Sequence, residues 1–107
     1  MISKRIADLG YDCGMIGKFH LQSSGMRTEP RIPNDGFRYW KFSHAPRDDW
    51  PEGEHDYADW VRENGGDLNS LRESPDNVPA RFHQSTWATT RAIEFLGEER
   101  GDQPWML

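Results

Sequence analysis

The residues with the clearest chemical potential lie in the segment Gly17-Lys18-Phe19-His20, which follows a stretch with strand character. Side chains two residues apart project from the same face of a strand, so we expect Lys18 and His20 to point together while Phe19 packs inward. In open α/β sheets, ligands bind at the carboxyl ends of the strands. A lysine and a histidine at that edge suit a tetrahedral oxyanion. The alternative interpretation is a solvated strand end followed by a loop histidine.

The stretch before this segment predicts the elements that position it. Residues 2–9 have apolar side chains at helical spacing, and Gly10 stands where a helix commonly stops. Residues 11–18 then predict a strand. Helix, glycine and strand in this order form half of an α/β unit. The apolar positions of the predicted helix are Ile2, Ile6 and Leu9.

A long loop is expected after the Lys18 and His20 pair. Residues 20–35 are rich in turn-forming residues and show no helical or strand periodicity. Long loops inside compact domains are usually functional or disordered. Residues 37–42 then predict a short aromatic strand, and residues 46–53 a proline-flanked acidic loop. The turn-forming groups are Ser23-Ser24-Gly25, Pro30, Pro33 and Asn34-Asp35-Gly36.

Two helices and a final strand are predicted in the second half of the chain. A short helix with apolar side chains at positions i, i+3 and i+4 ends at Asn64-Gly65-Gly66, and residues 67–79 are expected to be irregular. A longer helix begins near Ser85, where Ser85 or Thr86 can cap it. Residues 105–107 predict the opening of a buried strand. The apolar side chains are Tyr57, Trp60 and Val61 in the short helix, and Ala88, Ala92, Phe95 and Leu96 in the longer one.

Length and composition limit the classes of protein that fit. The chain has 107 residues, a formal net charge of −5 and 12% aromatic residues, so a folded α/β segment is expected rather than a disordered one. The acidic balance disfavours nucleic-acid binding, because clustered Lys and Arg are missing. No apolar run is long enough for a membrane span, and no targeting segment indicates a compartment. The single cysteine, Cys13, excludes an internal disulfide.

The segment around Lys18 resembles the second signature of the sulfatase family, which belongs to the alkaline phosphatase superfamily. Gly10-Tyr11 and Gly17-Lys18-Phe19-His20 match that signature, whereas Cys13 stands where the family usually has Ser or Thr. Residues 34–40 resemble the Gly-Phe-aromatic segment that follows in the family. Residues 85–107 resemble its later helix and strand.

This resemblance implies an α/β fold, with a mixed sheet flanked by helices, and a sulfuric ester hydrolase activity. Lys18 and His20 would be catalytic and substrate-binding residues that contact the sulfate and the nucleophile. The family's nucleophile is a formylglycine made from a Cys/Ser-x-Pro-x-Arg motif, and its cofactor is a divalent metal ion, usually Ca²⁺. Neither that motif nor the family's metal-binding motifs occur here, and Cys13 lacks the required proline and arginine.

The chain is therefore interpreted as residues 1–107 of a partial sulfatase-like catalytic domain, truncated at both ends and inactive by itself. No metal ligand is assigned, because His20, His44, His55 and His83 lack zinc-like spacing. The acidic residues from Asp48 to Asp59 are expected on solvated faces. His44 is a candidate substrate-side residue, His83 is expected to have a capping or solvent role, and the tryptophans are expected to pack in the core.

Other functions remain open at this point. Lys18 and His20 would equally stabilise the anion in a phosphonate or phosphate monoester hydrolase of the same superfamily. A non-catalytic anion-binding remnant and a coincidental match in a small acidic domain are further alternatives. The expected partner is a small-molecule or carbohydrate sulfate ester. Its identity, the oligomeric state and the compartment do not follow from the sequence.

Overall fold

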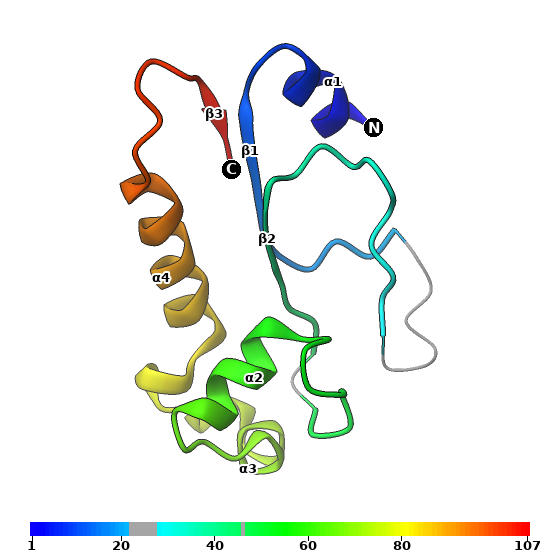
Figure 1. Cartoon of the computed structure of the whole chain (residues 1–107). Coiled ribbons are helices and arrows are strands. Elements are labelled where there is room, and N and C mark those ends of the chain that lie inside the picture. Colours follow the sequence, from blue (N-terminus) through cyan, green and yellow to red (C-terminus); the bar gives the residue numbers. More distant parts are fainter. Residues whose placement is uncertain (22–27, 46) are drawn as a thin grey trace.

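A small parallel sheet connects the two ends of the protein. Its strand order is β2-β1-β3, with β1 (Asp12–Gly17) between β2 (Tyr39–Phe42) and β3 (Trp105–Met106). The protein is thus a mixed α/β structure, as the sequence predicted. Figure 1 shows the long excursion of the chain between β1 and β2. The computed structural model describes residues 1–21, 28–45 and 47–107.

Helices pack on both faces of β1. Successive residues of a strand point to opposite faces of the sheet, so neighbouring residues of β1 contact different helices. The thiol of Cys13 faces α1 (Ile2–Asp8), whereas Gly14 faces α4 (Gln84–Gly97). A Cβ atom on Gly14 would lie only 3.0 Å from Cε2 of Phe95. The glycine therefore allows α4 to pack closely against the sheet, as Figure 1 shows.

The first helix is present as predicted, but its apolar side chains do not form a buried face. Ile2 and Leu9 are 71% and 78% exposed, whereas Ser3 is buried. The Ser3 hydroxyl donates a hydrogen bond to the carbonyl oxygen of Asp35 across 2.5 Å. The helix thus packs through a small polar residue, since close approach to β1 and to the loop before β2 leaves little room for large side chains.

The main core lies among the helices of the second half. It includes α2 (Asp56–Glu63) and α3 (Leu68–Glu73), followed by the 3₁₀ turns η1 (Pro75–Asn77) and η2 (Ala80–Phe82). The prediction that residues 67–79 are irregular is therefore wrong in part, because α3 and η1 lie within this range. The core residues are Tyr57, Ala58, Val61, Leu68, Leu71, Phe82 and Trp87.

Some details of the last helix and strand also differ from the prediction. His83, rather than Ser85 or Thr86, caps α4, because its Nδ1 accepts a hydrogen bond from the backbone N–H of Ser85 across 3.1 Å. This confirms the expected capping role of His83. Leu96 and Trp105 are each 50% exposed, so neither the full apolar stripe nor a buried final strand is present.

One predicted turn and the first residue of a predicted loop lie outside the described residues. These are the turn at Ser23-Ser24-Gly25 and the start of the acidic loop at Pro46. Within the described ranges, no helix has both the length and the apolar character that crossing a membrane requires.

Candidate functional site

Lys18 and His20 directly follow the central strand. The strand ends at Gly17, whose φ of +117° belongs to the left-handed half of backbone space, and His20 has a φ of +43°. The two-residue alternation of a strand therefore does not extend to Lys18 and His20, and this part of the prediction is wrong. The turn after β1 sets their positions instead. A positive φ is uncommon at a residue other than glycine, although histidine adopts it more readily than most residues.

Phe19 anchors this turn, as predicted. Its ring packs edge-on against Phe37, with ring centres 5.5 Å apart, and against Trp40, at 5.3 Å. Lys18 and His20 remain exposed on either side of it. The packing of Phe19 therefore fixes the turn, and the side chains of Lys18 and His20 are exposed to solvent.

His44 lies beside His20 because β1 and β2 are parallel. Parallel strands end at the same sheet edge, and His44 follows β2 as His20 follows β1. The centres of the two imidazole rings are 5.7 Å apart. Burial lowers the pKa of His44 below its usual value, and the positive charge of Lys18 lowers it further. His44 is therefore mainly neutral at pH 7.

The buried ring of His55 contacts the backbone of His44. His55 is fully buried, and its Nε2 lies 2.9 Å from the backbone nitrogen of His44. Its Nδ1 lies 3.1 Å from the backbone nitrogen of Ala58 in α2. Burial lowers the pKa of His55, which keeps the ring neutral. Since a neutral imidazole accepts at one nitrogen only, we assign the hydrogen bond to the shorter contact, from His44.

Glu29 completes the group and was missed by sequence reasoning. Its side chain is only 4% exposed, and its Oε2 lies 3.6 Å from Nδ1 of His20. Glu29 lies in the loop predicted over residues 20–35, outside any motif. The only signal in the sequence was the position of this loop next to Lys18 and His20.

The acidic residues near α2 have structural roles. Asp56 accepts a hydrogen bond from the backbone N–H of Phe42 across 2.6 Å. Asp59 accepts from the backbone N–H of Gly53 and from the guanidinium group of Arg62. These bonds hold the amino end of α2 to β2 and to the preceding loop, and they occupy the carboxylates.

The grouping of potential metal ligands in this region does not suit Ca²⁺. Within the part of the chain that the structure describes, the single grouping of three potential ligand residues is His20, Glu29 and His44. Ca²⁺ takes six to eight oxygen ligands, so two imidazoles and one carboxylate do not fit it. We therefore derive no catalytic step through calcium.

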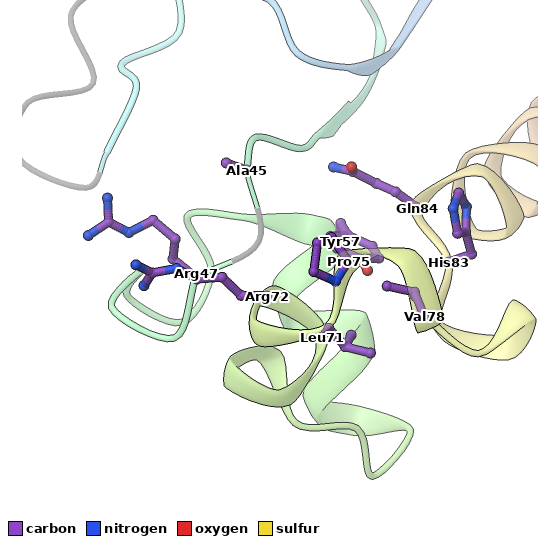
Figure 2. A pocket seen from close by; sticks show the side chains of 9 residues that line it. All are labelled: Ala45, Arg47, Tyr57, Leu71, Arg72, Pro75, Val78, His83 and Gln84. Carbon is purple, nitrogen blue, oxygen red and sulfur yellow. The ribbon is translucent and has the colours of Figure 1, made fainter.

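A separate pocket of about 430 Å³ is lined in part by Ala45, the residue that follows His44. Figure 2 shows the apolar side chains of Leu71 and Val78 on one side of it and the polar side chain of Gln84 on another. The amide nitrogen of Gln84 donates to the carbonyl oxygen of His44 across 2.9 Å. The pocket lining is Ala45, Arg47, Tyr57, Leu71, Arg72, Pro75, Val78, His83 and Gln84.

Comparison with protein-family models, with curated proteins and with solved structures found no match to this chain.

Proposed function

We propose that this chain is part of a sulfuric ester hydrolase of the sulfatase type, in which Lys18 and His20 bind the sulfate group and His44 borders it. One observation carries the proposal. The carboxyl ends of the parallel strands β1 and β2 bring Lys18, His20 and His44 to one sheet edge. Ligands of open α/β sheets bind at that edge. The resemblance of the segment Gly17-Lys18-Phe19-His20 to the sulfatase signature supplies the substrate class.

The charges of these residues suit a sulfate ester. A sulfate monoester carries one negative charge, and negative charge grows on its leaving oxygen as the sulfur–oxygen bond breaks. The ammonium group of Lys18 provides a fixed positive charge, which is the kind of contribution that usually dominates such catalysis. His20 is a hydrogen-bond donor beside it. His44, mainly neutral because burial lowers its pKa, offers a hydrogen bond without adding charge.

The neighbouring pocket is suited to the organic part of the ester. Gln84 lines this pocket and also donates a hydrogen bond to the carbonyl oxygen of His44. Leu71 and Val78 form part of the apolar side of the pocket. In the proposal, this pocket holds the aryl or alkyl group of the ester. The pocket itself does not include either of these two residues.

The described residues supply binding groups rather than the nucleophile. Cys13 is 1% exposed, and burial raises the pKa of its thiol. A buried thiol of raised pKa is a poor nucleophile. Because the sequence has no Cys/Ser-x-Pro-x-Arg motif, the proposal assigns the nucleophile to residues outside these 107.

Anion binding to the purified chain tests the role of Lys18. Inorganic sulfate and 4-nitrophenyl sulfate are titrated at low ionic strength and followed by NMR chemical shifts. A charge-assisted hydrogen bond contributes roughly 1.5–3 kcal/mol, so Lys18→Ala should weaken sulfate binding about tenfold to a hundredfold. Lys4→Ala is the matched control, because it also removes one positive charge but lies in α1, where Lys4 pairs with Asp8. Equal affinity in the Lys18→Ala and Lys4→Ala variants would overturn the assignment.

The coding sequence on either side of the segment tests the enzyme class. A Cys/Ser-x-Pro-x-Arg motif upstream would support a sulfatase. A reading frame without that motif would overturn the sulfatase mechanism and favour a non-catalytic anion-binding protein. That protein is the second candidate because these 107 residues do not contain the motif. Where the motif is found, parallel assays on sulfate and phosphonate esters separate the two hydrolase classes.

A further inference from the structure

Three potential metal ligands from separate segments converge above the ends of β1 and β2. His20 follows β1, Glu29 lies in the loop between the strands, and His44 follows β2. One ligand atom from each residue lies within 4.8 Å of the other two. The distance from Nδ1 of His20 to Oε2 of Glu29 is 3.6 Å.

Two of these residues each have a buried side-chain atom without a hydrogen-bond partner. Among the described residues, no donor reaches Oε2 of Glu29 and none pairs with Nε2 of His44. The Glu29 side chain is 4% exposed, so solvent does not compensate its carboxylate. Buried polar atoms in native proteins are almost always hydrogen-bonded, and the ion-pair contact from Nδ1 of His20 to Oε2 of Glu29, at 3.6 Å, is too long for a hydrogen bond. Both unpaired atoms belong to the three-residue group, which points to a missing ligand there.

The donor set selects the type of ligand. Two imidazole nitrogens and one carboxylate oxygen suit borderline divalent ions, and His₂Glu sets occur in catalytic zinc sites. We propose that His20, Glu29 and His44 bind a divalent transition-metal ion of the Zn²⁺ class, with one coordination position left open. This proposal does not rest on the sulfate ester assignment, although His20 and His44 belong to both sites and only Lys18 belongs to the sulfate site alone.

The geometry is compatible with such a site after a small closure. Zinc bonds to histidine and carboxylate are roughly 2.0–2.2 Å long, which places tetrahedral ligand atoms about 3.3–3.6 Å apart. The 3.6 Å distance between His20 and Glu29 already matches this spacing. The His20 side chain is 56% exposed and is therefore free to adjust. His44 is held in place by the contact with His55 and by its packing against Trp50.

Metal titration of the purified chain tests the proposal. Zn²⁺ affinity is measured by competition with a chelating dye, and Co²⁺ is added separately as a spectroscopic probe of coordination. The wild-type chain should bind one equivalent and give the intense visible absorption of four- or five-coordinate Co²⁺. Loss of residues that merely support a ligand weakens metal sites by 10–100-fold, so Glu29→Gln and His44→Asn should each cost at least about that much.

His83→Asn is the matched control. His83 is an exposed histidine that caps α4, a role that asparagine also fills. Its variant should keep the wild-type Zn²⁺ affinity. Equal affinity in the wild-type, Glu29→Gln and His44→Asn chains would overturn the proposal, and so would an equal loss in His83→Asn, which would indicate adventitious binding to surface histidines.

X-ray absorption on the wild-type zinc complex keeps the proposal testable if a variant fails to fold. Two imidazole ligands and oxygen donors are expected, and a shell that contains sulfur or oxygen alone would overturn the proposal. Lys18→Ala separates the two assignments, because it should weaken sulfate binding without weakening Zn²⁺ binding. If the wild-type chain binds sulfate but not Zn²⁺, the metal assignment is wrong. If it binds Zn²⁺ but not sulfate, the sulfate assignment is wrong.

Discussion

Arg100 and Asp12 form a buried ion pair between distant parts of the chain. Nε of Arg100 donates to Oδ2 of Asp12 across 2.5 Å, and the two side chains are 8% and 4% exposed. Arg38 binds the other oxygen of the same carboxylate across 2.6 Å. Asp12 therefore joins the start of β1 to the segments before β2 and before β3.

The first prediction concerns the stability of the protein in acid. Hydrogen bonding to Arg38, together with Arg100, lowers the pKa of Asp12 from 3.8 to about 2. A carboxyl group whose pKa is depressed by folding adds stability above its unfolded pKa and loses it as pH falls toward the folded value. We expect about 2 kcal/mol to disappear between roughly pH 5 and pH 2. Urea unfolding across this range should show a shallower dependence on pH in Asp12→Asn, and parallel curves for the two proteins would contradict the prediction.

The second prediction concerns the turn before β2. Gly36 has a φ of +91°, and a Cβ atom there would lie 2.6 Å from the backbone Cα of Lys4. Gly36→Ala should therefore cost at least about 2 kcal/mol, because neither the backbone conformation nor the clash is easily relieved. Gly97→Ala is the control, since nothing lies within 4 Å of its Cβ position. Thermal unfolding should separate the two variants, and similar midpoints would be inconsistent with this packing.

The sequence predicted the elements whose local signals agree with their tertiary surroundings. The strand expected over residues 11–18 and the helix that ends before Asn64-Gly65-Gly66 are both present. The core role expected of the tryptophans is confirmed for Trp50 and Trp87, which are 3% and 1% exposed. For the strand and the helix, periodicity and turn residues agree with the observed elements.

Other features depend on contacts that a single sequence does not encode locally. Helix α3 was missed because its signal is short: Asp67 accepts a hydrogen bond from the backbone N–H of Asn69, and only Leu68 and Leu71 are buried. The burial of the Glu29 side chain depends on tertiary surroundings, and no periodicity in the sequence marks it. The meeting of His20 and His44 required knowledge that β1 and β2 are parallel neighbours.

The third prediction concerns the main core. The hydroxyl of Tyr57 donates to the carbonyl oxygen of Phe82 across 2.6 Å in a buried setting. Tyr57→Phe would leave that carbonyl without its partner, which should cost about 1–3 kcal/mol. Tyr11→Phe is the matched control, because Tyr11 is 40% exposed. Urea unfolding would show a clear loss for Tyr57→Phe alone, and a neutral result would mean that water replaces the lost donor.

The last prediction concerns the sign of the Glu29 effect on anion binding. The Glu29 carboxylate lies 3.6 Å from Nδ1 of His20, where its negative charge opposes a sulfate held by His20 and Lys18. Glu29→Gln keeps the shape of the side chain and removes the charge. Sulfate affinity should rise roughly threefold to tenfold at low salt and less at high salt, because mobile ions screen the repulsion. The same substitution should weaken Zn²⁺ binding, so sulfate and metal titrations of one variant should move in opposite directions. Weaker sulfate binding in Glu29→Gln would indicate instead that the carboxylate orients His20 toward the anion.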